Sequence, residues 1–84
     1  MNNKLKKVFS YTTVFEAAEE GGFVVHVPAL PGCHTQGDTF EEAMEMAKDA
    51  IGGYLEVLKE EGRKIPIEKE ETVVTRINIP HGFI

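Results

Sequence analysis

The sequence has few of the residues that usually mark a metal centre, a catalytic site or an extracellular location. Its 84 residues include one cysteine, three histidines and no tryptophan. A single cysteine cannot form an internal disulfide, which favours a reducing, cytoplasmic environment. No apolar run approaches the ~20 residues of a membrane span, and no continuous apolar segment of a signal peptide opens the chain. We therefore expect a cytoplasmic protein with no membrane contact and, since these few ligands match no zinc-binding spacing, no metal or other cofactor.

Basic residues are also scarce. Nine lysines and arginines stand against fourteen aspartates and glutamates, a formal net charge of −5. Because a phosphate backbone attracts clustered positive charge, this balance argues against direct nucleic-acid binding and favours a basic protein partner. The remaining composition, 42% hydrophobic and 27% charged, is that of an ordinary globular protein, and residues 1–84 are expected to form one domain.

The first part of the chain predicts a β-hairpin. Residues 8–17 and 23–27 are rich in β-branched and aromatic residues, which is typical of strands. Gly21 and Gly22 lie between them and can adopt the positive φ of a tight turn. The two strands should therefore pair antiparallel.

A corner and two further strands complete the predicted sheet. Two prolines should end the ladder after residue 27, and Gly32 allows the chain to turn into a third strand at 33–36. Near the end of the chain, apolar residues alternate over 72–79, which predicts a final strand.

Residues 39–61 carry the clearest pattern, that of an amphipathic helix. Asp38 at the N-cap and Glu41 three residues later form an aspartate version of the capping box, and Gly62 suits the position just after the helix. The predicted order is β-β-β-α-β, an α+β fold with one helix on one face of an antiparallel sheet. The apolar stripe consists of Phe40, Ala43, Met44, Ala47, Ala50, Ile51, Tyr54, Leu55 and Leu58.

The segment LPGCHTQGDT, residues 30–39, places a cysteine, a histidine and an aspartate close together, as an active site would. Cys33 and His34 are neighbours in a predicted strand, so they point to opposite faces and are poorly placed to act as nucleophile and base. Cys33 is explained as a small buried residue after a turn, and Asp38 as a helix cap. The segment is interpreted as a structural corner; whether His34 is solvated or contacts a partner stays open.

Several short motifs between Gly21 and Pro66 occur in a recognisable order. They are a Gly-Gly-aromatic turn, a Pro-x-Leu-Pro-Gly corner, a polar strand with Gly-Asp-Thr, and an acidic, alanine-rich helix that ends before a glycine. Together they resemble the HicB family of antitoxins. The residues that supply them are Gly21-Gly22-Phe23, Pro28-Ala29-Leu30-Pro31-Gly32-Cys33, Thr35-Gln36-Gly37-Asp38-Thr39, Glu41-Glu42-Ala43, Ala47, Ala50, Tyr54 and Gly62.

This resemblance implies a partial RNase H-like fold and the antitoxin role in a type II toxin–antitoxin pair. The partner would be a small basic HicA-like toxin, an mRNA-cleaving ribonuclease whose active surface the antitoxin masks. An acidic module suits such a toxin, because a protein that binds RNA presents a positive face. RNase H chemistry needs several carboxylates around two metal ions, whereas the predicted strands offer mainly Glu16, so we expect no enzymatic activity.

Many HicB-like proteins also carry a C-terminal DNA-binding domain. Here only residues 68–84 follow Ile67, and they predict one strand and a short tail. We therefore expect a short antitoxin that does not itself bind an operator. The alternative is an orphan oligomeric regulatory or scaffold domain without a toxin partner.

The expected partner-binding surface has two parts, the corner and the exposed acids of the helix. A strand that is apolar on both faces, in a sheet with one helix to cover it, also predicts a homodimer or larger homo-oligomer, joined through the sheet or the last strand. The candidate partner-binding residues are Pro28, Leu30, Pro31, His34, Glu41, Glu42 and Glu45.

Overall fold

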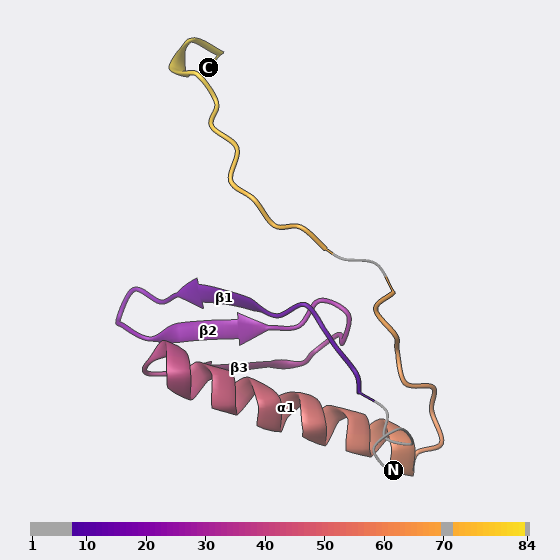
Figure 1. Cartoon of the computed structure of the whole chain (residues 1–84). Coiled ribbons are helices and arrows are strands. Elements are labelled where there is room, and N and C mark those ends of the chain that lie inside the picture. The colour runs from indigo at the N-terminus through magenta and orange to yellow at the C-terminus, as the bar shows by residue number, and fades with distance from the viewer. Residues whose placement is uncertain (1–7, 70–71, 84) are drawn as a thin grey trace.

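The computed structural model describes residues 8–69 and 72–83. Within this part of the chain, three antiparallel strands in the order β1-β2-β3 form one layer, and a long helix along one face forms the second (Figure 1). The predicted α+β class and the β-β-β-α order are confirmed. The elements are β1 (Val14–Ala17), β2 (Phe23–His26), β3 (His34–Gly37), α1 (Phe40–Glu60) and a final 3₁₀ turn, η2 (His81–Phe83).

The register of the sheet assigns each strand residue to one of its two faces. Phe15 pairs with Val25, and Val25 pairs with Thr35 across the sheet. Val25 is fully buried and packs with Ala43 and Ala47 of α1, so this row faces the helix. Because side chains alternate along a strand, the neighbouring rows lie on the opposite face. These rows comprise Val14, Glu16, Val24, His26, His34 and Gln36, of which all but Val14 are exposed.

The first strand begins at Val14, so the prediction that it starts at residue 8 is wrong. Its partner β2 ends at His26, one residue earlier than predicted. The next residue, Val27, donates its N–H to the carbonyl oxygen of Cys33 (3.1 Å) and so belongs to the corner. Residues before Val14 therefore have no neighbouring strand with which to continue the ladder. The third strand lies one residue later than predicted, at His34–Gly37.

The predicted helix is confirmed, but its N-cap is Thr39 and not Asp38. The Thr39 side-chain oxygen accepts a hydrogen bond from the N–H of Glu42 (3.0 Å), and Oε1 of Glu42 accepts one from the N–H of Asp38 (2.5 Å). The sequence offers the capping spacing twice, as Asp38 with Glu41 and as Thr39 with Glu42. Because β3 continues to Gly37, the helix starts one residue later and uses the second pair.

The helix ends as predicted at Gly62, which has a φ of +69°. Its N–H donates to the carbonyl oxygen of Lys59 (3.1 Å), and the N–H of Arg63 donates to that of Leu58 (2.8 Å). These two bonds form a Schellman motif, which a glycine in the left-handed region permits. The glycines predicted for the turns, at 21, 22 and 32, also have positive φ.

Residues 72–79 do not form a strand, contrary to the sequence prediction. In Figure 1 the segment 72–83, called the tail from here on, runs away from the sheet and the helix. The radius of gyration is 16.4 Å, whereas a compact domain of this length has one of ~12 Å. A strand needs a neighbouring backbone for its hydrogen bonds, and no described segment of this chain lies paired with the tail. The large aliphatic residues Val73, Val74, Ile77 and Ile79 are 62–82% exposed.

Candidate partner-binding surface

The corner after β2, residues 27–33, is stabilised by hydrogen bonds within its own backbone. The N–H of Leu30 donates to the carbonyl oxygen of Val27 (3.0 Å), and the N–H of Cys33 donates to that of Leu30 (2.9 Å). The side chains of all three residues are buried and form one cluster, with Leu30 fully enclosed. Partly buried residues from α1 and the N-terminal segment complete this cluster: Tyr11, Ala50, Ile51, Tyr54 and Leu55.

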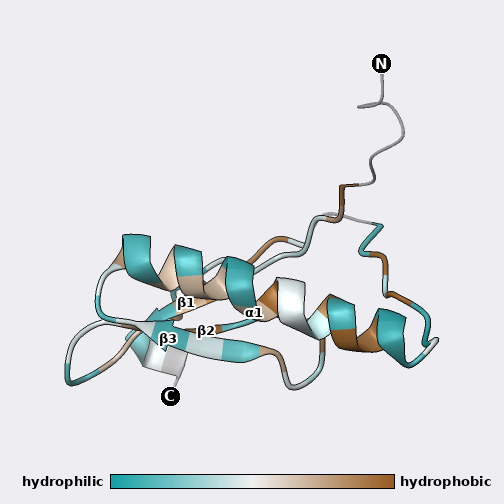
Figure 2. Cartoon of the chain, turned by 90° about the horizontal axis from the view of Figure 1, so that it is seen from below, coloured by the Kyte–Doolittle hydropathy of each residue, from teal (hydrophilic) through white to brown (hydrophobic). Residues whose placement is uncertain are grey.

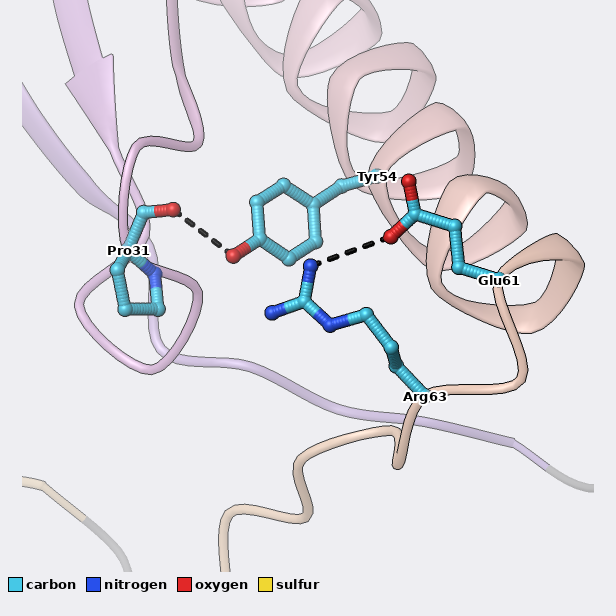
Figure 3. Close-up of polar contacts among 4 residues, drawn as sticks. All are labelled: Pro31, Tyr54, Glu61 and Arg63. Carbon is cyan, nitrogen blue, oxygen red and sulfur yellow. Dashed lines mark hydrogen bonds and ion pairs between the residues drawn. The ribbon is translucent and has the colours of Figure 1, made fainter.

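A hydrogen bond also joins the corner to the C-terminal half of α1. The hydroxyl of Tyr54 donates a hydrogen bond to the carbonyl oxygen of Pro31 (2.8 Å), as Figure 3 shows. In the same view Arg63 points back to Glu61, with 3.2 Å between the guanidinium and the carboxylate. That ion pair is exposed and so contributes little to stability. The Tyr54 bond adds a polar contact to the apolar packing between the corner and the helix.

Burial decides the role of Cys33. Loss of solvation raises the pKa of its thiol above the usual value. The thiolate is the nucleophilic form of cysteine, so this thiol is protonated and inert at neutral pH. The neighbouring His34 is exposed on the face of the sheet turned away from the helix. The interpretation of this segment as a structural corner agrees with the geometry.

The predicted corner residues divide into exposed and buried ones. Pro28, Pro31 and His34 are exposed, whereas Leu30 has no exposed surface. The side chain of Leu30 therefore belongs to the core, and a partner could reach it only if the corner opened. His34 lies directly across from His26 in the register of β2 and β3, so two histidines stand side by side on the exposed face.

The predicted acids Glu41, Glu42 and Glu45 are exposed in the first turns of α1. Glu42 is engaged in the helix cap, and Glu45 forms an exposed ion pair with Lys48 at 3.4 Å. Glu42 precedes Tyr54, the residue that contacts the corner, by twelve positions. At 1.5 Å per residue these two points of the helix lie ~18 Å apart. The structure therefore does not bring the seven candidates into one site, and β3 runs between the two groups.

A surface hollow of about 420 Å³ lies at the N-terminal end of α1, where the hairpin turn, the end of β3 and the helix meet. Three of its lining residues are acidic and none is basic. Val24 and Met46 add apolar surface and are 44% and 41% exposed. The lining consists of Ala18, Glu20, Gly21, Phe23, Val24, Gln36, Gly37, Asp38, Glu42 and Met46.

Sequence reasoning identified only Glu42 of this hollow as a partner-binding residue. The other members come from four separate segments, so no local motif joins them. The available signals are weak. Met46 stands off the apolar stripe of the helix, and Val24 occupies the second apolar face of its strand. Both are large apolar residues that the fold leaves exposed, which is typical of binding surfaces.

The chemistry of the hollow suits the side chain of a lysine or an arginine. Such a side chain has an apolar stem, which Val24 and Met46 can cover, and a cationic end, which the carboxylates of Glu20 and Asp38 attract. The hydropathy colouring in Figure 2 places the most strongly hydrophobic residues of α1 in its C-terminal half.

Two negative findings hold for residues 8–69 and 72–83. No group of three or more histidine, cysteine, aspartate or glutamate side chains among them is arranged to hold a metal ion. No helix in this part of the chain is long and apolar enough to cross a membrane.

The structure is a small α+β module with a hollow lined by three acidic residues and no basic one. Residues 11–80 match the model of a protein family described as the HicB-like antitoxin of a bacterial toxin–antitoxin system. The chain belongs to this family of antitoxins.

Named relatives agree with this assignment. A UPF0150 protein of Thermoplasma acidophilum is 48% identical over 63 residues, which cover 75% of this chain and 91% of the relative. Antitoxin HicB 1 of Photorhabdus laumondii is 46% identical over 61 residues, 73% of this chain but 39% of that protein. Antitoxin HicB of Escherichia coli is 39% identical over 57 residues, 68% of this chain and 41% of that protein. The similarity to both HicB proteins therefore concerns less than half of their length.

Proposed function

We propose that this chain binds and neutralises a small basic, mRNA-cleaving toxin of the HicA kind in the cytoplasm. Membership of the antitoxin family supports a toxin partner in general. The observation that carries the finer proposal is the acidic hollow at the start of α1, because a toxin that binds RNA must present lysines and arginines.

The surface around the hollow has the same sign of charge. Between Phe40 and Glu60, α1 carries six acidic and two basic residues, and the acidic ones in its first turns are exposed. Surfaces of opposite charge steer two proteins together and suppress wrong partners. In the proposed complex, α1 faces the RNA-binding surface of the toxin, and one of the toxin's basic side chains occupies the hollow.

A binding role without catalysis agrees with the described residues. Cys33 is buried with a raised pKa, so it offers no nucleophile. Glu16 lies on the exposed face of β1 in one cross-strand row with Val24 and Gln36, neither of which can bind a metal as a carboxylate does. We therefore propose that neutralisation occurs by covering the toxin and not by a reaction.

Co-expression tests the proposal. The tagged chain is produced together with the product of the adjacent small reading frame, and growth and mRNA cleavage are measured with and without the chain. We expect a stable complex and restored growth. If the neighbour is toxic but neither binds nor is silenced, the antitoxin proposal fails. If it is harmless and does not bind, an orphan regulatory domain replaces the proposal.

A matched pair of charge reversals tests the hollow itself. Glu20→Lys places a cation in the hollow, whereas Glu60→Lys makes the same change at the far end of α1. We expect the first to weaken toxin binding by at least tenfold and the second by less than threefold, in titrations at low salt. Equal effects of the two variants would show that the charge of the whole protein matters and not the hollow.

A further inference from the structure

The tail contains a strand-like sequence that the described chain does not use. Val73, Thr75, Ile77 and Ile79 share one side of an extended backbone, and Arg76 lies on the other. The large aliphatic residues among them are 62–82% exposed. β1 stands at an edge of the sheet, so its outer side has backbone groups that no strand pairs. If the strand-like segment paired with such an edge, the backbone hydrogen bonds of both would be satisfied.

The connector between α1 and the tail is anchored beside the chain that leads into β1. The N–H of Thr12 donates to Oε1 of Glu68 (2.8 Å), and the Thr12 hydroxyl donates to Oε2 of the same carboxylate. One residue earlier, the hydroxyl of Tyr11 donates to the carbonyl oxygen of Pro66 (2.6 Å). The connector therefore reaches the open edge of the sheet just before β1 begins.

The lengths of the two segments decide whether the tail can use its own β1. Ala17, the end of β1, lies five residues after Thr12. Val73, where the apolar alternation starts, likewise lies five residues after Glu68. At ~3.3 Å per residue, a tail running alongside β1 reaches the end of the strand when the alternation starts. The apolar residues from Val73 to Ile79 would then extend beyond their own sheet.

We propose that residues 73–79 add as a fourth strand to the open edge of β1 in a second copy of this chain. Each copy gives its tail and receives the other's, so the exchange closes in a two-fold symmetric dimer and leaves no tail free. This inference concerns self-association and does not depend on the identity or existence of a toxin. It supplies the fourth strand that the sequence pattern predicts and the single chain does not form.

Charge and burial select how the exchanged strand lies on β1. Glu16 is exposed on the face turned away from the helix, and Phe15 faces the helix. If the exchanged strand runs antiparallel to β1 with Arg76 beside Glu16, then Ile77 falls on the helix side, next to Phe15. There Phe40 contacts Phe15, with 4.9 Å between ring centroids, yet is 46% exposed. The added strand would therefore pair one charge and cover a half-open aromatic contact in the same register.

Cysteine cross-linking distinguishes exchange from self-pairing. One chain carries Glu16→Cys and a second, differently tagged chain carries Arg76→Cys; the two are co-expressed, purified and oxidised with copper phenanthroline. The native Cys33 is buried and so provides a low background. We expect a disulfide between the two differently tagged chains. The control replaces Arg76→Cys by Thr75→Cys, which turns the thiol to the other face and should cross-link at least fivefold less.

A second measurement does not rely on disulfides. In sedimentation equilibrium the unmodified chain should be a dimer, and Ile77→Asp should raise the dimer dissociation constant at least tenfold. Asn78→Asp adds the same charge on the opposite side of the tail and should change it less than threefold. A monomer at all concentrations, or the absence of a disulfide between the two differently tagged chains, would overturn the proposal.

Discussion

Single residues of the corner show how the same amino acids can suggest chemistry and yet serve packing. Cys33 stands beside a histidine and near an aspartate in the sequence, but its thiol faces Val27 and Leu30 in a buried cluster. The position of Leu30 is the clearest case, since no part of it is exposed. At this scale the deciding quantity is burial, which the sequence predicted for Cys33 but not for Leu30.

Replacing Leu30 tests this structural role. Leu30→Ala removes a fully buried side chain and leaves a cavity between the corner and α1. We expect the free energy of unfolding to fall by about 2–5 kcal/mol, measured by urea denaturation. Pro28→Ala, at an exposed position of the same corner, is the control and should cost much less. A loss below 1 kcal/mol for Leu30→Ala would mean that the corner is not part of the core.

Two glycines give opposite predictions. A Cβ on Gly37 would lie 2.5 Å from the backbone nitrogen of Ala43, so Gly37→Ala pushes β3 and α1 apart and should destabilise the protein by about 1–3 kcal/mol. A Cβ on Gly52 meets nothing within 4 Å. Gly52→Ala should therefore stabilise the helix by about 0.5–1 kcal/mol. Thermal unfolding of both variants checks the pair, and equal signs would contradict it.

At the scale of elements, the helix was the most predictable part because its signals are local. Its stripe repeats over five turns, and its Schellman glycine lies where the pattern ends. The start was misplaced by one residue, since Asp38 and Thr39 both have a glutamate three residues later. The bounds of the strands were harder to predict, because a strand ends where its partner strand ends and not where its own β-branched residues stop. The hollow could not be predicted, since four segments meet there only in three dimensions.

The N-cap offers a direct test of the corrected boundary. Thr39→Ala removes the oxygen that accepts the N–H of Glu42 and should lower the free energy of unfolding by about 0.5–2 kcal/mol. Asp38→Ala leaves that bond intact, because Asp38 contributes its backbone N–H and not its carboxylate to the cap. We expect a clearly smaller loss for Asp38→Ala in chemical denaturation. A reversed order would restore Asp38 as the cap.

At the scale of the whole molecule, the chain divides into a packed body and a tail that the body does not cover. Sequence patterns predicted a strand in the tail, and the residue types do favour one. Whether a strand forms depends on a backbone partner, and in the described part of a single chain the tail lies beside none. The connector that joins body and tail is fixed by Glu68, whose carboxylate accepts two hydrogen bonds from Thr12.

This attachment should depend on pH. The hydrogen bonds from the Thr12 side chain and backbone lower the pKa of Glu68 below its usual value. A lowered pKa means that the ionised carboxylate stabilises the attachment above the unfolded-state pKa of ~4.3. The contribution is lost as the pH falls from that value through the lower pKa of the folded state.

Amide exchange at Thr12 measures the effect, because its N–H is protected only while Glu68 accepts it. We expect protection of this amide, corrected for intrinsic exchange, to be constant from pH 7 to 5 and to fall below pH 4. Glu68→Gln should reduce protection at neutral pH and remove the pH dependence, since an amide does not titrate in this range. Glu19→Gln, an exposed carboxylate in the hairpin turn, serves as control and should leave the profile unchanged. If the Thr12 amide stays protected to pH 2, the carboxylate does not hold the connector, and the starting point of the exchanged tail must lie elsewhere.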